Sequence, residues 1–224
     1  MRRKAGPHGV GGFSLIEVMV VLAILAGLIT TGTVMLGIAR KKQRVHETEL
    51  RLAALAAAIE DLRSNDNLQR YPPANIAKLS YTGFDGAKWN AGANTKNVGI
   101  ETLYVCFRLP GIHAMPKNLD AEDCIGNTDG DSASAPIGNL QKTDLFEYLD
   151  AWGNPFVYFS ASDYKDTSKV EQYVLNDEAH TEVKVAPRKN EQNGEFQRLD
   201  SYQLMSLGPD GQPGTEDDIV FGGK

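Results

Sequence analysis

The chain has 224 residues, 42% of them hydrophobic, and a formal net charge of −6 at pH 7. This acidic balance argues against nucleic acid as a partner, because phosphate binding favours a basic surface. The sequence contains no glycine-rich phosphate loop, no nucleophile elbow and no HExxH zinc motif, so we expect a protein that is not an enzyme.

The N-terminus is a short basic leader followed by a long apolar run. Residues 1–12, MRRKAGPHGVGG, contain basic residues and no acid, and residues 13–39 are almost entirely apolar or small. As a helix the apolar run is about 39 Å long, enough to cross a hydrocarbon core of about 30 Å. It is too long for the core of a secretory signal peptide, and no A-x-A cleavage site follows it. We therefore expect a transmembrane helix.

One carboxylate, Glu17, interrupts this run near its start. A lone acid in a membrane helix costs roughly 2.5–3.5 kcal/mol on insertion scales, so it needs a partner. The hexapeptide G-F-S-L-I-E, residues 12–17, resembles the type III signal of type IV pilins and type II secretion pseudopilins. The resemblance implies that a prepilin peptidase cuts after Gly12 and methylates Phe13. It also implies that Glu17, fifth in the mature chain, meets the N-terminal amine of a neighbouring subunit during filament assembly.

The helix departs from the family pattern at one position. Many members have a helix-kinking proline at the twenty-second mature position, which is Val34 here. Gly27, Gly32 and Gly37 are the candidates for loosening the helix instead, and small residues also let neighbouring helices pack closely. The family's local melting of the helix therefore does not carry over directly.

Residues 40–64 begin with a basic cluster and are predicted to continue the helix as an amphipathic half. The pair Glu47 and Arg51 has i,i+4 spacing and is expected on a polar flank. The apolar positions have the 3-4-3 spacing of one buried face: Leu52, Leu55, Ile59 and Leu62. One helix of about 50 residues is expected, half in lipid and half packed on a globular domain.

Residues 65–145 form a variable insert that is rich in Gly, Asn and Asp and weakly periodic. Residues 101–108 are predicted to form a strand, and residues 144–149 a short helix. An even pair of cysteines in an exported chain, Cys106 and Cys124, predicts a disulfide closing a loop of about 18 residues, worth about 3 kcal/mol; two buried free thiols are the alternative.

A second acidic stretch lies in this insert, at residues 120–131. Its D-G-D sequence lacks the complete calcium-loop pattern with a terminal glutamate. We interpret the stretch as a solvated loop pinned by the disulfide rather than as a second calcium site.

Residues 146–224 are predicted to form a sheet. Residues 156–160, 171–175 and 202–206 are rich in aromatic and β-branched side chains, which favour strands. The preceding turn D-A-W-G-N-P, residues 150–155, resembles the D-P-W-G-N-x motif of major pseudopilins, the G subunits of type II secretion, with Ala151 in place of the usual proline. Taken alone, WGNP is equally consistent with a tight turn that places Trp152 in the core.

The C-terminal stretch from Ser206 to Ile219 resembles the S-x-G-P-D-G-x-x-G-T-E-D-D-I loop of the same pseudopilins. The resemblance implies a calcium (Ca2+) site, and calcium takes six to eight oxygen ligands. Glu216 is expected to face solvent, and a solvated acidic turn is the alternative. The implied ligands are the carboxylates of Asp210, Asp217 and Asp218 and the carbonyls of Leu207 and Pro213.

Together these features predict an α+β, type IV pilin-like fold, with a long N-terminal helix packed on a small antiparallel sheet and a calcium-binding C-terminal loop. The expected protein is a single-pass inner-membrane subunit with its C-terminal domain in the periplasm, which assembles with copies of itself into a type II secretion pseudopilus. Its implied partners are the prepilin peptidase, minor pseudopilins, the inner-membrane assembly platform and the membrane. The alternatives are a surface type IV pilin and, from another class, a membrane-anchored periplasmic binding protein or enzyme.

Overall fold

The computed structural model describes most of the chain. The described residues are 14–65, 71–81, 84–89, 95–136, 143–164, 170–190 and 192–222, with only the helical backbone described at residues 31–34. The cleavage and methylation residues Gly12 and Phe13 lie outside these ranges. The chain divides into two units, Met1–Gln43 and Arg44–Lys224, and each is considered by itself.

A single helix, α1, runs from Leu15 to Asn65 and contains 51 residues. It confirms the predicted helix of about 50 residues, and it passes Val34 without a break. Its apolar first part is the one helix among the described residues that is long and apolar enough to cross a membrane. None of that apolar window is buried within the structure.

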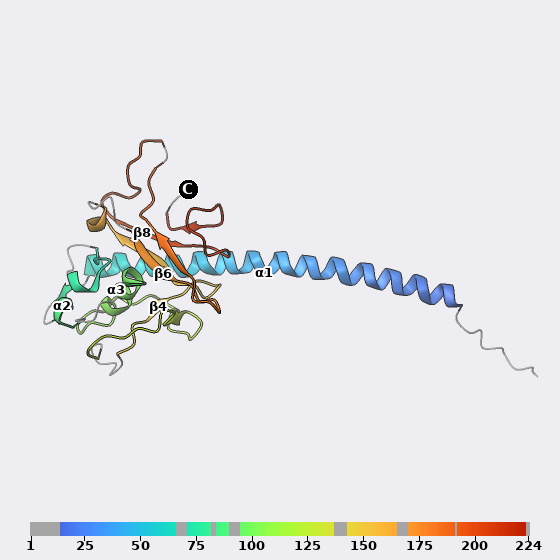
Figure 1. The fold of residues 1–224 in the computed structure, drawn as a ribbon, viewed down its shortest axis with the longest axis horizontal. Coiled ribbons are helices and arrows are strands. Elements are labelled where there is room, and N and C mark those ends of the chain that lie inside the picture. The colour runs from blue at the N-terminus through green and yellow to red at the C-terminus, as the bar shows by residue number, and fades with distance from the viewer. Residues whose placement is uncertain are drawn as a thin grey trace, which may run out of the picture. The chain divides into compact units, whose positions relative to one another are not determined.

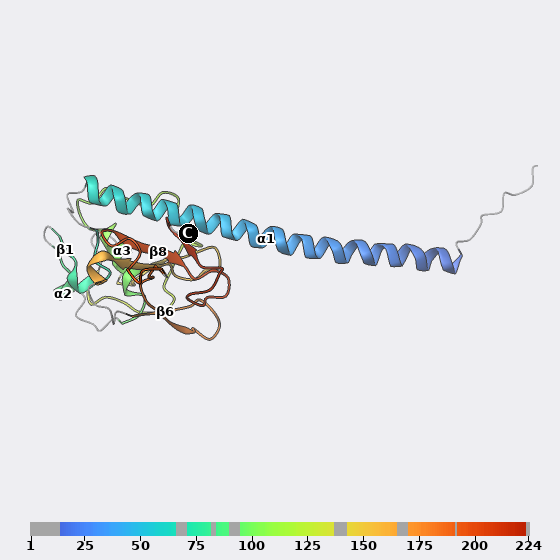
Figure 2. The same cartoon turned by 90° about the horizontal axis from the view of Figure 1, so that it is seen from above.

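The second part of α1 packs on the globular unit as its spacing predicted. Leu52, Leu55, Ile59 and Leu62 are all 2% exposed or less. In Figure 2 this part of the helix covers one side of the unit, with α3 and β8 beneath it. Arg51, expected on a polar flank, is instead buried, with 7% of its side chain exposed. The polar-flank prediction was wrong because the guanidinium has backbone acceptors inside the unit, described below.

The longest strands form two antiparallel groups (Figure 1). The central strand β8, Tyr202–Ser206, pairs with β5, Val157–Ser160, on one side and with β9, Ile219–Val220, on the other. Strand β6, Glu171–Val174, pairs with β7, Glu182–Val185. These strands confirm the predictions for residues 156–160, 171–175 and 202–206.

The remaining elements are short. Two further strand pairs join β1, Ser80–Tyr81, to β2, Phe84–Asp85, and β3, Ile125–Gly126, to β4, Glu147–Tyr148. The short helical elements are η1, Ile76–Lys78, α2, Gly86–Trp89, and η2, Ala161–Asp163.

Two secondary-structure predictions in the insert were wrong. Residues 101–108, expected as a strand, lie mostly in helix α3, Val98–Cys106. Every residue from Gly99 to Cys106 is buried, so the apolar run has no polar face that could reveal a helical period. Residues 144–149, expected as a helix, contain strand β4 instead.

The predicted disulfide is not formed in the structure. Cys106 and Cys124 are both buried thiols. Cys106 ends α3 in the core, whereas the Cys124 sulfur lies 3.9 Å from the Asn118 carbonyl oxygen and 3.7 Å from Asp123 Oδ1. An even number of cysteines does not fix their geometry, and a bridge needs both sulfurs to be brought together.

Candidate functional site

The first candidate site is the start of α1, where Glu17 caps the N-terminus of the helix. The Ser14 carbonyl oxygen accepts hydrogen bonds from the backbone N–H groups of Glu17, at 3.0 Å, and Val18, at 3.2 Å. In return, Glu17 Oε2 accepts from the Ser14 backbone N–H at 2.9 Å. An acid at the third helical position that satisfies the N-cap N–H in this way is half of a capping box. The S-x-x-E spacing is visible in the sequence, but Glu17 was interpreted there only as an acid that needs a positively charged partner.

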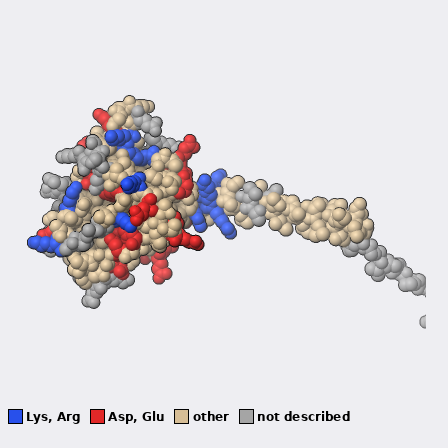
Figure 3. Space-filling view, in the orientation of Figure 1, with Lys and Arg blue, Asp and Glu red and all other residues tan. Residues whose placement is uncertain are grey.

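The surface of α1 around Glu17 is apolar on all sides. Large side chains between Leu15 and Ile38 are exposed, with Leu15 at 77% and Ile16 at 68%. In Figure 3 the described part of this apolar surface ends at a group of basic side chains, the cluster at residues 40–44. An exposed apolar surface of this extent indicates contact with lipid or with other protein chains.

The second candidate site is built on the turn at residues 150–155, which Asp150 organises. Asp150 Oδ1 accepts hydrogen bonds from the backbone N–H groups of Trp152, at 2.8 Å, and Asn154, at 3.0 Å. Gly153, with a φ of +87°, donates its N–H to the Asp150 carbonyl oxygen at 3.0 Å. Trp152 is half-buried at this turn rather than fully inside the core.

Two contacts attach this turn to α1. The backbone N–H of Ala151 donates to Thr48 Oγ1 at 3.2 Å, and Thr48 is fully buried. The Arg51 guanidinium donates to the carbonyl oxygens of Leu149 and Asp150, both at 3.1 Å. The departure from the family motif therefore has a structural use, because a proline at position 151 would have no N–H to donate.

Asp150 also connects the turn to the C-terminal loop. Ser206 Oγ donates to Asp150 Oδ2 at 2.6 Å and accepts from the Gly208 N–H at 3.0 Å. Gly208 has a φ of +66°, and a Cβ there would lie 2.4 Å from the Asp217 carbonyl oxygen. Only glycine lets the end of the loop fold back so closely over its beginning.

The C-terminal loop, residues 207–218, has more hydrogen-bond acceptors than donors. The Thr215 hydroxyl has one proton, yet Asp217 Oδ1 lies 2.6 Å from it, the Gln212 carbonyl oxygen 3.2 Å and Asp210 Oδ1 3.5 Å. Asp210 Oδ1 also accepts from the Gln212 N–H at 2.8 Å. Glu216 is exposed, as expected.

Asp218 is the most buried acid of the loop, with 2% of its side chain exposed. Its Oδ2 atom accepts from the Gly214 N–H at 2.8 Å and from Arg188 Nη1 at 3.0 Å. Its Oδ1 atom is buried and has no hydrogen-bond partner in the part of the chain that the structure describes. Burial raises the pKa of Asp218, and the charges of Asp217 and Asp210 raise it further.

These residues fit a hard cation in their chemistry. The loop supplies three carboxylates, an acceptor-rich interior and one buried carboxylate oxygen in need of a positive partner. The two carbonyl-ligand candidates lie on the same loop: Leu207 is buried at its start, and Pro213 is half-buried further along it. Calcium bound there would supply the missing positive charge.

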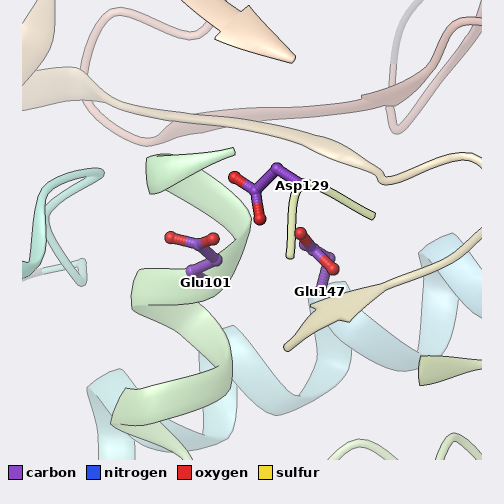
Figure 4. Close-up of side chains that lie close together, drawn as sticks. All are labelled: Glu101, Asp129 and Glu147. Atoms are coloured by element: carbon purple, nitrogen blue, oxygen red, sulfur yellow. The ribbon is translucent and has the colours of Figure 1, made fainter. Parts of the chain in front are cut away.

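A tighter carboxylate group lies elsewhere, formed by two acids of the insert and by Glu147 of β4 (Figure 4). Carboxylate oxygens of Glu101, Asp129 and Glu147 lie within 4.8 Å of one another, and no other set of His, Cys, Asp or Glu side chains among the described residues was found to meet in this way. Glu101 comes from α3, Glu147 from β4 and Asp129 from the loop between β3 and β4, and their side chains point toward one another.

The insert's acidic stretch is thus only partly the solvated loop that the sequence indicated. Residues 120–123 are exposed, whereas Asp129 and Asp131 are half-buried. Glu147 is fully buried and accepts from Asn97 Nδ2 at 2.7 Å and from the Thr128 N–H at 3.1 Å. No local pattern in the sequence indicated this group, because its members are far apart along the chain.

Burial keeps a proton on Glu147 at neutral pH. It raises the pKa of Glu147 to about 8, with a smaller contribution from the charge of Asp129 and an opposing one from the Asn97 hydrogen bond. It also raises the pKa of Asp131 to about 7, again with help from the charge of Asp129 and against a hydrogen bond with Glu101. Carboxyl groups this close in the interior share protons rather than ionise together.

Comparison with known proteins bears on the N-terminal site. Residues 8–30 match the family model described as the prokaryotic N-terminal methylation motif, which is typical of type IV pilin-like proteins. The matched region includes Gly12, Phe13 and Glu17 and the start of α1. Neither curated proteins nor solved structures gave a match.

Proposed function

We propose that this chain, which carries the methylation motif, is a structural subunit of a periplasmic type II secretion pseudopilus that drives protein export. The observation that carries the proposal is the motif at residues 8–30, which includes Glu17 and the first part of the exposed apolar segment of α1. Such a helix suits a membrane anchor before assembly and the packed core of a filament after it. The resemblance of the 150–155 turn and the C-terminal loop to major pseudopilins favours the secretion branch.

In this proposal the prepilin peptidase removes residues 1–12 and methylates the amine of Phe13. Before assembly the chain is a single-pass inner-membrane protein with its globular unit in the periplasm. The assembly platform and minor pseudopilins then start a filament of identical subunits, in which Glu17 meets the amine of a neighbouring Phe13. Pairing the two charges removes the penalty of burying either one alone.

The intact mass of the chain extracted from membranes tests the N-terminal processing. The expected product begins at Phe13 and is one methyl group heavier than residues 13–224. A Gly12→Ala variant should retain its leader and serves as the matched control. A wild-type chain that still begins at Met1 would contradict the proposal and favour a membrane-anchored binding protein or enzyme.

A second measurement separates the pseudopilus from its nearest alternative, a surface type IV pilin. Deleting the gene should leave secreted proteins in the periplasm, and shearing should release no filaments of this chain from the cell surface. Sheared filaments containing the chain, together with normal secretion in the deletion strain, would assign it to adhesion, motility or DNA uptake instead.

We infer further that the C-terminal loop binds calcium through the carboxylates of Asp210, Asp217 and Asp218, with carbonyl oxygens from Leu207 and Pro213. The acceptor-rich interior of the loop and the buried Asp218 Oδ1 support this assignment. A cation that binds only the folded chain stabilises it by about 2.7 kcal/mol at about 100 times its Kd.

The melting temperature (Tm) in calcium and in EDTA tests the calcium site. Calcium should raise the Tm of the wild-type chain, and Asp217→Ala should abolish that rise. Glu216→Ala is the matched control, because Glu216 is an exposed acid next to Asp217 and should leave the rise intact. An equal Tm in calcium and EDTA would remove the site.

A further inference from the structure

Arg188 reaches the C-terminal loop from a segment that is fixed independently of its side chain. Its backbone N–H donates to Gln203 Oε1 at 2.6 Å, and its carbonyl oxygen accepts from Gln203 Nε2 at 2.9 Å. Gln203 lies on the central strand β8 and is 1% exposed. The position from which the guanidinium extends is therefore set by the sheet.

The guanidinium contacts only one of the two Asp218 oxygens. Arg188 Nη1 and the Gly214 N–H both bind Oδ2, at 3.0 and 2.8 Å. Oδ1 remains buried and without a hydrogen-bond partner among the described residues. The two donors hold the carboxylate by Oδ2, and this fixes the direction in which Oδ1 points.

Residues that hydrogen-bond a metal-ligating side chain affect the metal affinity of the site. Partners that hydrogen-bond a ligating carboxylate orient it, and their loss costs 10- to 100-fold in metal affinity.

We propose that Arg188 is a positioning residue of the calcium site: it holds Asp218 by Oδ2 so that Oδ1 is the oxygen offered to the cation. This inference rests on the calcium site proposed above. A guanidinium that competed with calcium would be expected on Oδ1, whereas Arg188 shares Oδ2 with the Gly214 N–H.

Calcium titration of the full chain in detergent, by isothermal calorimetry, tests the role of Arg188. Arg188→Gln should raise the Kd for calcium 10- to 100-fold. Arg188→Lys should raise it less, because lysine keeps the charge but lacks the planar fork of donors. Lys184→Gln removes one exposed positive charge from the neighbouring strand β7 and should leave the Kd unchanged.

The Tm in EDTA separates positioning from a purely structural ion pair. A structural pair would lower this Tm in Arg188→Gln while the folded variant bound calcium with the wild-type Kd, and that result would overturn the proposal. Tighter binding by Arg188→Gln would also overturn it, by identifying Arg188 as a competitor. If Arg188→Gln does not fold, the test uses Arg188→Lys with Lys184→Gln as its control. A wild-type Kd for calcium in both variants would overturn the proposal.

A wild-type chain that binds no calcium would overturn both this proposal and the calcium site. The pseudopilus proposal would survive that result, because N-terminal processing and secretion are measured separately.

Discussion

At the scale of single residues, burial decides the charge of Glu147. Glu147 is fully buried, and its pKa is raised from 4.5 to about 8. Between these two pH values the folded chain keeps a proton on Glu147 that the unfolded chain has released. The unfolded state therefore gains relative stability as pH rises, and the free energy of unfolding falls through this window.

We expect Glu147→Gln to flatten this pH dependence, because a glutamine side chain holds no titrating proton. The measurement is the free energy of unfolding in urea between about pH 5 and about pH 8. Part of the slope should remain, since Asp131, with a pKa raised to about 7, still titrates in the variant. Glu178→Gln, at an exposed position, is the control and should follow the wild-type curve. Parallel curves for wild type and Glu147→Gln would contradict the expectation.

Candidate site residues can be grouped from the sequence where they are close together in the chain. The proposed calcium ligands Asp210, Asp217 and Asp218 share one loop whose spacing is visible in the sequence, and their role stays a prediction. Arg188 was missed because only the fold brings it to Asp218, and Glu101 and Glu147 were missed for the same reason. Long-range pairings of this kind leave no local pattern in the chain.

At the scale of elements, the attachment of α1 to the 150–155 turn depends on the residue that departs from the family motif. Ala151→Pro would remove the N–H that Thr48 Oγ1 accepts. We expect a loss of about 1 kcal/mol in the free energy of unfolding, the usual net value of one hydrogen bond.

A double-mutant cycle with Thr48→Val isolates this contact. In the Thr48→Val background the acceptor is already absent, so Ala151→Pro should cost less than in the wild type. The same cost in both backgrounds would mean that the proline acts through backbone strain rather than through Thr48.

Arg51 is the second attachment of α1. It bonds the carbonyl oxygens of Leu149, Asp150 and Asp123, and it forms ion pairs with Glu47 and with Asp123, at 2.6 Å for the latter. We expect Arg51→Ala to destabilise the chain by about 3 kcal/mol, because several buried acceptors lose their donor together.

Chemical denaturation measures this loss. Arg63→Ala is the control, since Arg63 lies on the same helix and half-exposed. A loss from Arg51→Ala no larger than that of the control would show that the buried guanidinium contributes little beyond an exposed ion pair.

Elements could be predicted where the sequence carried a specific signal. The apolar spacing from Leu52 to Leu62 contrasts one face of the helix with the other. The strands at 156–160 and 202–206 were predicted from their aromatic and β-branched content, although every residue of β5 and β8 is buried. Helix α3 shows no contrast between faces, because its residues are buried on every side. An apolar run with no polar face is compatible with either a buried strand or a buried helix.

At the scale of the whole molecule, the chain consists of an apolar helical segment and a globular unit that contains the core. The buried hydrophobic cluster of the described residues lies between Leu52 and Leu207, entirely within Arg44–Lys224. No residue of this buried cluster comes from residues 1–43.

We expect a chain that begins at Arg44 to be soluble and to unfold cooperatively, with a Tm close to that of the full chain in detergent. Circular dichroism during heating measures both. A chain that begins at Ala58 lacks Arg51, Leu52 and Leu55 and should not fold. Aggregation or gradual melting of the Arg44 chain would show that the apolar segment contributes to the globular fold.

The cap at the start of α1 bears on the assembly proposed above. Ser14 donates to only one oxygen of Glu17, Oε2. A carboxylate has a second oxygen, so in the proposed filament the amine of a neighbouring Phe13 would bind Glu17 while the first turn of the helix stays hydrogen-bonded. A subunit would then join the filament without unwinding the start of α1, because the acid that caps the helix would also bind the neighbouring amine.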